Sequence, residues 1–169
     1  IQKKSALELL GQIKENSFDN ILEIGCGTGN YTLLLRERFE AAKIKAVDIS
    51  SRMIDVAREK FNGSGIEFII ADAEKLNLKE NFGLITSNAC FQWFADLEKA
   101  LLMYKGLLKK QGVISFSIFG PHTFWELNTS LKYLFKNKFI VTDNFLARDK
   151  IKKLLQKKRN IKDALAITG

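Results

Sequence analysis

Short apolar segments alternate with amphipathic ones along most of this chain. Five apolar runs have the length of buried strands: 21–24, 44–47, 66–71, 82–87 and 113–119. Between and beyond them, apolar residues recur every three or four positions, the period of a helix with one buried face, at about 2–15, 31–39, 51–61, 97–109 and from 123 onward. Strands that alternate with helices of about 10–15 residues predict an α/β fold with a doubly wound, mostly parallel sheet.

The first apolar run ends in a glycine-rich loop, Glu23-Ile24-Gly25-Cys26-Gly27-Thr28-Gly29-Asn30. Glycines at a strand-to-helix turn let a ligand touch the backbone next to the free N–H groups of the helix N-terminus. The spacing is G-x-G-x-G, and Asn30 stands where a dinucleotide fingerprint requires a third glycine. Glu23 would repel a pyrophosphate but suits an ammonium group, as in S-adenosylmethionine. A glycine-rich turn without a ligand is the alternative.

Two later strands each end in an aspartate. Asp48 follows the run 44–47 and lies 19 residues after Gly29, where a carboxylate can accept hydrogen bonds from a ribose diol. Asp72 follows the run 66–71 in the same way. An aspartate at a strand end is also an ordinary turn or N-cap residue, so capping is the alternative at both positions.

Polar and aromatic residues are mixed after the fourth apolar run, in Ser87-Asn88-Ala89-Cys90-Phe91-Gln92-Trp93-Phe94. The aromatic residues suit a core, but Asn88 and Gln92 are poor core residues unless they make polar contacts. Residues 23–29 resemble the first motif of the class I S-adenosylmethionine-dependent methyltransferases. The pattern S-N-x-x-x-Q-W resembles the carboxyl methyltransferases for small acids, which include the trans-aconitate and malonyl-acyl-carrier-protein O-methyltransferases. Residues 116–127 and both chain ends look most like the second group, which acts in biotin synthesis.

This resemblance implies a Rossmann-like fold and a set of cofactor-binding residues: Glu23, Gly25, Cys26, Gly27, Gly29, Asp48, Ile49, Met53, Asp72, Ala73 and Asn88. In that set Asp72 would bind the adenine amino group, while Gln92 and Trp93 would shape the reacting end as catalytic residues. The implied enzyme transfers a methyl group to the free carboxylate of a malonyl thioester on acyl carrier protein. A methyltransferase for a small free acid such as trans-aconitate, a nucleic-acid methyltransferase and a non-catalytic binding module remain alternatives.

Charge is distributed unevenly along the chain. Residues 101–169 hold 14 Lys or Arg but four Asp or Glu, whereas residues 1–100 are slightly acidic. Such a basic region predicts an acidic partner, and acyl carrier proteins are acidic as a class. The basic run continues from Lys150 to Arg159 between apolar residues, so an ordinary solvated helix is the alternative. Aromatic residues are not interleaved with these charges, which disfavours nucleic acid.

The remaining composition predicts one domain over 1–169 in a cytoplasmic protein without a membrane span. Two isolated cysteines and one histidine form no zinc or disulfide pattern, so we expect no metal; a catalytic pair of Cys90 and His122 is a weaker alternative. After Phe139-Ile140-Val141 the pattern is a basic helix, whereas the resembled family ends its sheet with a strand hairpin. We therefore expect an incomplete C-terminal hairpin. Because 161–169 still resembles the end of that family, we expect segments to be missing from this sequence before Gln2 and between 141 and 161, and truncation is the alternative.

Overall fold

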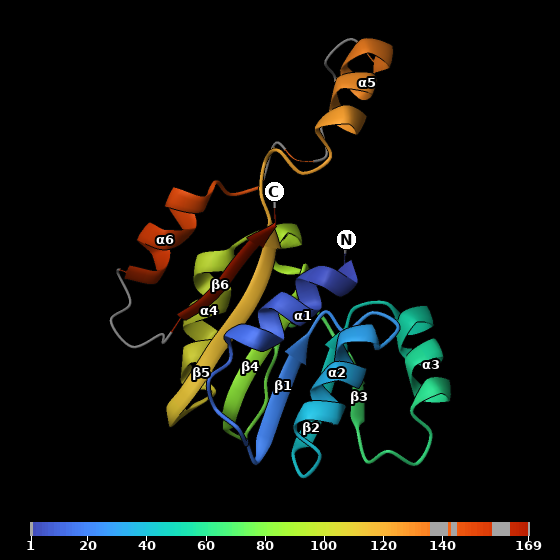
Figure 1. The fold of residues 1–169 in the computed structure, drawn as a ribbon, viewed down its shortest axis with the longest axis vertical. Coiled ribbons are helices and arrows are strands. Elements are labelled where there is room, and N and C mark those ends of the chain that lie inside the picture. Colours follow the sequence, from blue (N-terminus) through green and yellow to red (C-terminus); the bar gives the residue numbers. More distant parts are fainter. Residues whose placement is uncertain (1, 136–141, 143–144, 157–162, 169) are drawn as a thin grey trace.

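The apolar runs form neighbouring strands of one sheet in the computed structural model of the chain, which describes residues 2–135, 142, 145–156 and 163–168 (Figure 1). The strand order is β3-β2-β1-β4-β5-β6, and every neighbouring pair runs parallel. The bounds are β1 Asn20–Ile24, β2 Lys43–Asp48, β3 Glu67–Ile70, β4 Phe82–Asn88, β5 Leu108–Phe119 and β6 Asp163–Thr168. The predicted doubly wound parallel sheet is confirmed.

Helices cover both faces of this sheet, because side chains along a buried strand alternate between its two faces. In β2, Ile44 and Ala46 pack with the helices α1, α2 and α3, whereas Val47 belongs to the cluster under α4 and α6. The six helices described are α1 Gln2–Gln12, α2 Asn30–Arg38, α3 Ser51–Lys60, α4 Leu97–Gly106, α5 Trp125–Phe135 and α6 Arg148–Gln156. Two single 3₁₀ turns, η1 Ala73–Lys75 and η2 Phe91–Trp93, follow β3 and β4.

The structure differs from the sequence prediction mainly after β4. Strand β5 begins at Leu108 rather than at 113, which shortens the preceding helix. Helix α5 begins at Trp125 rather than at 123, because Phe124 has a left-handed φ of 69°. Strand β6 was not predicted; it pairs parallel with β5, so the described residues form no closing hairpin. The run 139–141 lies outside the described residues.

The parallel strands bring their carboxyl ends to one edge of the sheet. The loops that leave β1, β2, β3 and β4 therefore meet there, and they carry most of the predicted site residues. In the part of the chain that the structure describes, no helix is both long and apolar enough to cross a membrane.

Candidate cofactor site

The glycine loop between β1 and α2 has the backbone geometry that its sequence predicts. Gly25 and Gly27 have φ values of 71° and 54°, in the left-handed region that other residues rarely adopt. A Cβ atom at Gly25 would lie 2.4 Å from the Cys90 sulfur. Both the φ value and this close contact therefore exclude a side chain at Gly25. A Cβ atom at Gly27 would meet nothing within 4 Å. The loop is thus packed tightly against the segment after β4 at Gly25, and it has free space beside it at Gly27.

Asp48, at the end of β2, holds this loop in place. Its Oδ2 atom accepts a hydrogen bond from the Gly27 N–H at 2.8 Å, and its Oδ1 atom accepts one from the Ser50 N–H at 2.9 Å. The cap of α3 is Ser50, which accepts from the Met53 N–H, so Asp48 does not cap that helix. Each carboxylate oxygen has a second lone pair, so Asp48 retains the capacity to accept hydrogen bonds from a ligand.

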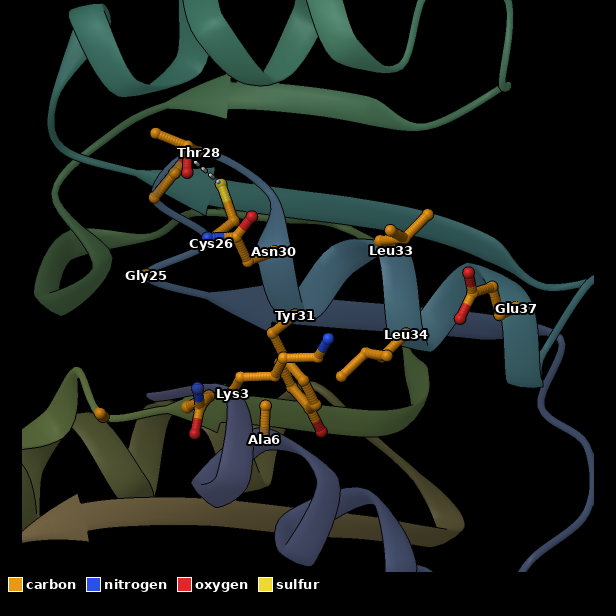
Figure 2. A pocket seen from close by; sticks show the side chains of 13 residues that line it. Lys3, Ala6, Gly25, Cys26, Thr28, Asn30, Tyr31, Leu33, Leu34 and Glu37 are labelled. Carbon is orange, nitrogen blue, oxygen red and sulfur yellow. Dashed lines mark hydrogen bonds between the residues drawn. The ribbon is translucent and has the colours of Figure 1, made fainter. Parts of the chain in front are cut away.

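Two cavities open around the loop, and Gly25 lines both of them. The strand-end cavity, of about 280 Å³, lies over the ends of β2, β3 and β4. The helix cavity, of about 520 Å³, lies between α1, α2 and the end of β4 (Figure 2). Predicted residues divide between them: Asp48, Ile49, Asp72, Ala73 and Trp93 line the strand-end cavity, and Cys26, Gly27 and Asn88 line the helix cavity. We call these two cavities, which share Gly25, the bipartite site.

Four predicted residues do not line either cavity in the described part of the chain: Glu23, Gly29, Met53 and Gln92. Gly29 caps the start of α2, and a Cβ atom there would lie 2.5 Å from the Phe61 ring. Met53 is 45% exposed on α3. The Gln92 side chain is buried and donates from Nε2 to the Ala89 carbonyl at 2.7 Å. In this structure Gln92 therefore stabilises the turn that follows β4. Its catalytic role stays a prediction.

Glu23 lies on β1 directly beneath the loop and is 1% exposed. Among the described residues neither of its carboxyl oxygens has a hydrogen-bond partner. Burial raises the pKa of Glu23 to about 8; the charge of Asp48 adds to the rise, and the nearby hydroxyl of Thr32 opposes it. The carboxyl group is thus mostly protonated at neutral pH. Its predicted contact with an ammonium group stays a prediction, because the side chain lies below the cavities rather than in their walls.

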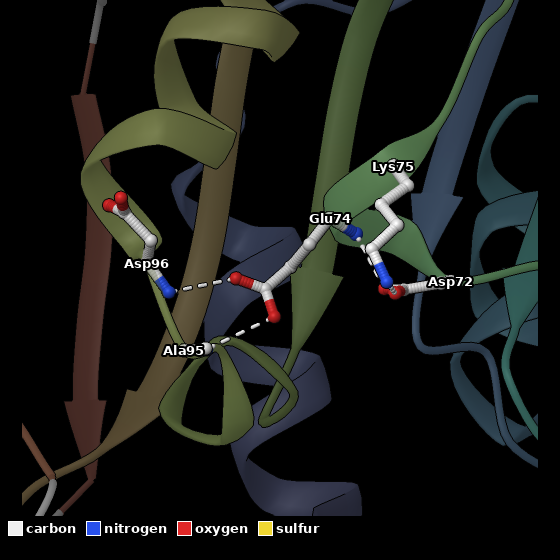
Figure 3. A network of polar contacts seen from close by, with 5 residues as sticks. All are labelled: Asp72, Glu74, Lys75, Ala95 and Asp96. Atoms are coloured by element: carbon white, nitrogen blue, oxygen red, sulfur yellow. Dashed lines mark hydrogen bonds and ion pairs between the residues drawn. The ribbon is translucent and has the colours of Figure 1, made fainter.

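Asp72 makes local contacts at the far side of the strand-end cavity. It caps the turn η1 by accepting from the Glu74 N–H at 3.0 Å, and it forms an ion pair with Lys75 at 3.0 Å (Figure 3). The hydrogen bond from Lys75 is the main cause that lowers the pKa of Asp72. The capping alternative is therefore observed, and adenine binding by Asp72 remains a prediction.

Glu74 was missed by the sequence analysis although it lines the strand-end cavity. Its carboxylate accepts from the Asp96 N–H at 2.8 Å and from the Ala95 N–H at 3.1 Å (Figure 3). These hydrogen bonds join the turn after β3 to the start of α4. Both donors are backbone groups more than 20 positions away, so no local pattern indicates the contact.

The end of β4 is tied to α1, the helix that forms one wall of the helix cavity. The Asn88 Oδ1 atom accepts from the Ser5 hydroxyl at 3.0 Å and from the Ser117 hydroxyl at 2.7 Å. These contacts explain a polar residue at this strand end. They also bring Lys3 and Ala6 of α1 into the cavity wall, and both of these residues were missed by the sequence analysis.

Comparison with known proteins agrees with this architecture. The family model described as a methyltransferase domain matches residues 22–116. The chain is 44% identical over 132 residues to malonyl-[acyl-carrier protein] O-methyltransferase of Acetivibrio thermocellus, covering 77% of this chain and 47% of that protein. It is 38% identical over 152 residues to the protein of that name from Bacillus anthracis, covering 88% and 56%. The chain thus spans about half the length of these curated relatives.

Solved structures show the same fold. An S-adenosylmethionine-dependent methyltransferase from Clostridium acetobutylicum superimposes with a TM-score of 0.64 at 29% identity, over 76% of this chain and 55% of that one. A putative methyltransferase from Haloferax volcanii, in complex with the activator Trm112, reaches a TM-score of 0.74 at 16% identity, which shows the fold alone. Because the family model covers more than half of the residues, the chain belongs to the methyltransferase-domain family, with the fold of the class I enzymes.

Proposed function

We propose that this chain binds S-adenosylmethionine in the bipartite site and that its protein methylates the free carboxylate of a malonyl thioester on acyl carrier protein. The observation that carries the cofactor proposal is that Gly25 lines both cavities. A ligand with a nucleoside at one end and an amino acid at the other can then lie across the loop. The substrate proposal is supported by the names of the relatives, which match most of this chain.

The residues present fit such a cofactor. The strand-end cavity offers the Asp48 carboxylate for a ribose diol, and it offers the apolar side chains of Ile49 and Ala73 for an adenine ring. The open space above Gly27 leaves the loop backbone accessible from the helix cavity. Tyr31 and Asn88 line the helix cavity, where the amino-acid end of the cofactor would lie. Such a cofactor carries no phosphate, so no phosphate site is needed.

The proposed chemistry asks for alignment rather than for acid–base catalysis. When bound, S-adenosylmethionine supplies a methyl group already activated by a positively charged sulfur. The malonyl carboxylate is ionised at pH 7, so no base is required to activate it. Burial raises the pKa of the Cys90 thiol to about 12, so this side chain is a neutral wall and not a nucleophile. Correct orientation of the two reactants can lower the barrier by about 7–11 kcal/mol.

The aromatic residues after β4 give the site an apolar rim. Trp93 and Phe94 line the strand-end cavity, and Trp93 is 60% exposed. The Trp93 ring meets that of Phe145 edge to face, with centroids 5.2 Å apart. An exposed tryptophan at the mouth of a cavity can exclude water once a substrate covers it. Trp93 therefore suits the role of shaping the reacting end.

We also propose that the basic C-terminal third docks the acidic carrier protein. Among the described residues of this third, the basic side chains gather on α6. One side of this helix packs on the core through Ile151 and Leu155. The opposite side of α6 is exposed and mostly cationic, with one acid among them: Arg148, Asp149, Lys150, Lys152 and Lys153. Phe145, three residues before α6, contacts Trp93 at the cavity. A carrier protein on α6 would thus lie near the rim. The basic run from 157 to 159 lies outside the described residues.

The test is methyl transfer by the full-length protein. We expect labelled methyl from S-adenosylmethionine to appear on malonyl-acyl carrier protein as a base-labile ester, and not on trans-aconitate or RNA. Asp48→Ala is the control variant, which should lose the signal through weaker cofactor binding. Label on trans-aconitate or RNA instead would contradict the substrate assignment. Absence of S-adenosylmethionine binding in calorimetry would contradict the cofactor assignment as well.

A further inference from the structure

A backbone outlier follows β4 at the point where the two cavities meet. Ala89 has a positive φ of 54°, which glycine adopts freely and alanine rarely does. Asn88 and Ala89 line the helix cavity, and Cys90 lines the strand-end cavity. The Cys90 sulfur also limits the space at Gly25, which both cavities share. The strained turn over 88–90, which we call the β4 turn, therefore shapes both halves of the bipartite site.

The hydroxyl of Ser117 on β5 makes two hydrogen bonds to the β4 turn. It donates to the Asn88 Oδ1 atom at 2.7 Å and accepts from the Ala89 N–H at 3.0 Å. Strand pairing places Ser117 directly opposite Asn88, so a short side chain reaches both groups. Ser117 is fully buried, and it is not among the described residues that line either cavity. Its effect on a bound ligand must therefore pass through the β4 turn.

The groups that the Ser117 hydroxyl contacts also have other partners. The Ala89 N–H reaches the Ser117 carbonyl oxygen at 3.1 Å, and the Asn88 Oδ1 atom accepts from the Ser5 hydroxyl at 3.0 Å. The Ala89 carbonyl accepts from the Gln92 amide at 2.7 Å. After loss of the Ser117 hydroxyl, each of these three groups would still have a partner. The fold should therefore tolerate the loss, whereas the positive φ of Ala89 should become less favoured.

Ser115 lies two residues earlier on β5 and offers a matched comparison. Its side chain is on the same face of the sheet as that of Ser117, because side chains alternate along a strand. It is fully buried as well, but its hydroxyl has no hydrogen-bond partner among the described residues. The two serines thus share a strand, a face and complete burial, and they differ in their contacts with the β4 turn.

We propose that Ser117 is a positioning residue that holds the β4 turn in its ligand-binding conformation before the ligand arrives. This inference rests on the proposed function, since the ligand is taken to be S-adenosylmethionine. Without the hydroxyl, Ala89 relaxes toward a negative φ in the free protein, and binding has to restore the strained conformation. The free energy of this rearrangement is subtracted from that of binding. The ligand then binds more weakly although no atom that lines the site has been removed.

The test is a double-mutant cycle of Ser117→Ala and Ala89→Gly in the full-length protein. Calorimetric dissociation constants for S-adenosylmethionine are measured for the wild type, the two single variants and the double variant. Ser117→Ala is expected to raise the constant about five- to thirtyfold, the equivalent of the usual cost of a left-handed conformation in a residue other than glycine. Because glycine adopts a positive φ without this cost, adding Ala89→Gly should restore most of the lost affinity.

Two controls separate positioning from folding. Ser115→Ala removes a buried hydroxyl from the same face of β5, and it should bind S-adenosylmethionine like the wild type. Urea unfolding of every variant shows whether it is folded under the conditions of the binding assay. If Ser117→Ala is not folded, the cycle is run with Ser117→Cys, which keeps a side chain of similar size but is a weak hydrogen-bond donor.

Three results would overturn the inference. The first is an unchanged dissociation constant in the Ser117 variant. The second is a loss of affinity that Ala89→Gly does not restore, which would mean a general disturbance of the core. The third is an equal loss in Ser115→Ala. A wild-type protein that does not bind S-adenosylmethionine would overturn the cofactor assignment and, with it, this role of Ser117. Failure to methylate malonyl-acyl carrier protein, with the binding pattern as expected, would overturn the substrate proposal and leave Ser117 in its role.

Discussion

Replacing Glu23 with glutamine is expected to stabilise the fold, increasingly so as the pH rises. The side chain is 1% exposed, and its two oxygens have no hydrogen-bond partner among the described residues. Burial raises its pKa from the usual 4.5 to about 8. Between these two values the unfolded chain releases the proton while the folded chain keeps it. The contribution of Glu23 to stability is thus highest below pH 4.5 and falls as the pH rises through 8.

The size of the effect follows from the two pKa values. They differ by about 3.5, and at about 1.4 kcal/mol per unit the full loss amounts to about 5 kcal/mol. Most of it falls between pH 5 and 8. Glutamine has nearly the same shape and no proton to lose in this range, so Glu23→Gln removes the pH-dependent part while keeping the volume. A difference of this size is a large fraction of the stability of an ordinary domain.

The assay is urea unfolding of the wild type and of Glu23→Gln at pH 5, 7 and 9 at constant ionic strength. The transition is followed by tryptophan fluorescence and by far-ultraviolet circular dichroism, whose agreement tests two-state behaviour. Glu59→Gln, at an exposed position of α3, is the matched control and should follow the wild type. The reasoning would be refuted if the gap between wild type and Glu23→Gln stayed constant from pH 5 to 9, or narrowed.

Further predictions concern the ligand. If a ligand ammonium meets Glu23, its charge lowers the pKa of this acid, so S-adenosylmethionine binding at pH 7 should release a proton; calorimetric heats should then vary with the ionisation enthalpy of the buffer, and Glu23→Gln should abolish the variation. Asp48→Ala removes the acceptor that holds the Gly27 N–H, worth about 1.5–3 kcal/mol, so the dissociation constant should rise roughly ten- to a hundredfold; an unchanged constant would contradict a role at the ribose. Gly25→Ala forces a Cβ atom to 2.4 Å from a sulfur at a φ of 71°, so unfolding should need less urea and cofactor binding should be lost; normal binding would refute this geometry. Reversing Lys152 and Lys153 to Glu should raise KM for malonyl-acyl carrier protein several-fold and leave malonyl-coenzyme A turnover unchanged, since exposed charges act mainly on association; equal losses on both substrates would exclude docking on α6.

Much of the site's location could be predicted because it depends on local patterns. A buried parallel strand is a short apolar run, and its end is marked by the first polar residue or glycine. The motifs at Gly25, Asp48 and Asp72 each follow such a run. Parallel strands place their carboxyl ends at one edge, so these motifs are neighbours once the strand order is given. Asp48 and Asp72 accordingly line one cavity together with Gly25.

Other roles could not be predicted because one residue type serves several purposes. The glutamine of the S-N-x-x-x-Q-W pattern is predicted to shape the reacting end, and this role stays a prediction; the pattern did not indicate that Gln92 donates to the carbonyl three residues before it. Asp72 shows the same ambiguity: the sequence allowed both a contact with adenine, which stays a prediction, and the cap of the 3₁₀ turn that the structure contains. Strand β6 escaped prediction because 163–168 is a short apolar segment after a basic run, and its pairing depends on an unpaired edge at β5. Neither the contact of Gln92 nor the pairing of β6 is encoded in spacing.

The order of residues along the chain was enough to establish the alternation of strands and helices, the glycine loop and the acids at the strand ends. These depend on hydrophobic period and on backbone freedom, which act over a few neighbouring residues. The burial of Glu23, the tie between Ser5 and Asn88 and the presence of Lys3 in the cavity wall emerged with the folded chain. They join positions as many as 83 residues apart, and burial and long-range contacts of this kind arise when whole elements pack against each other.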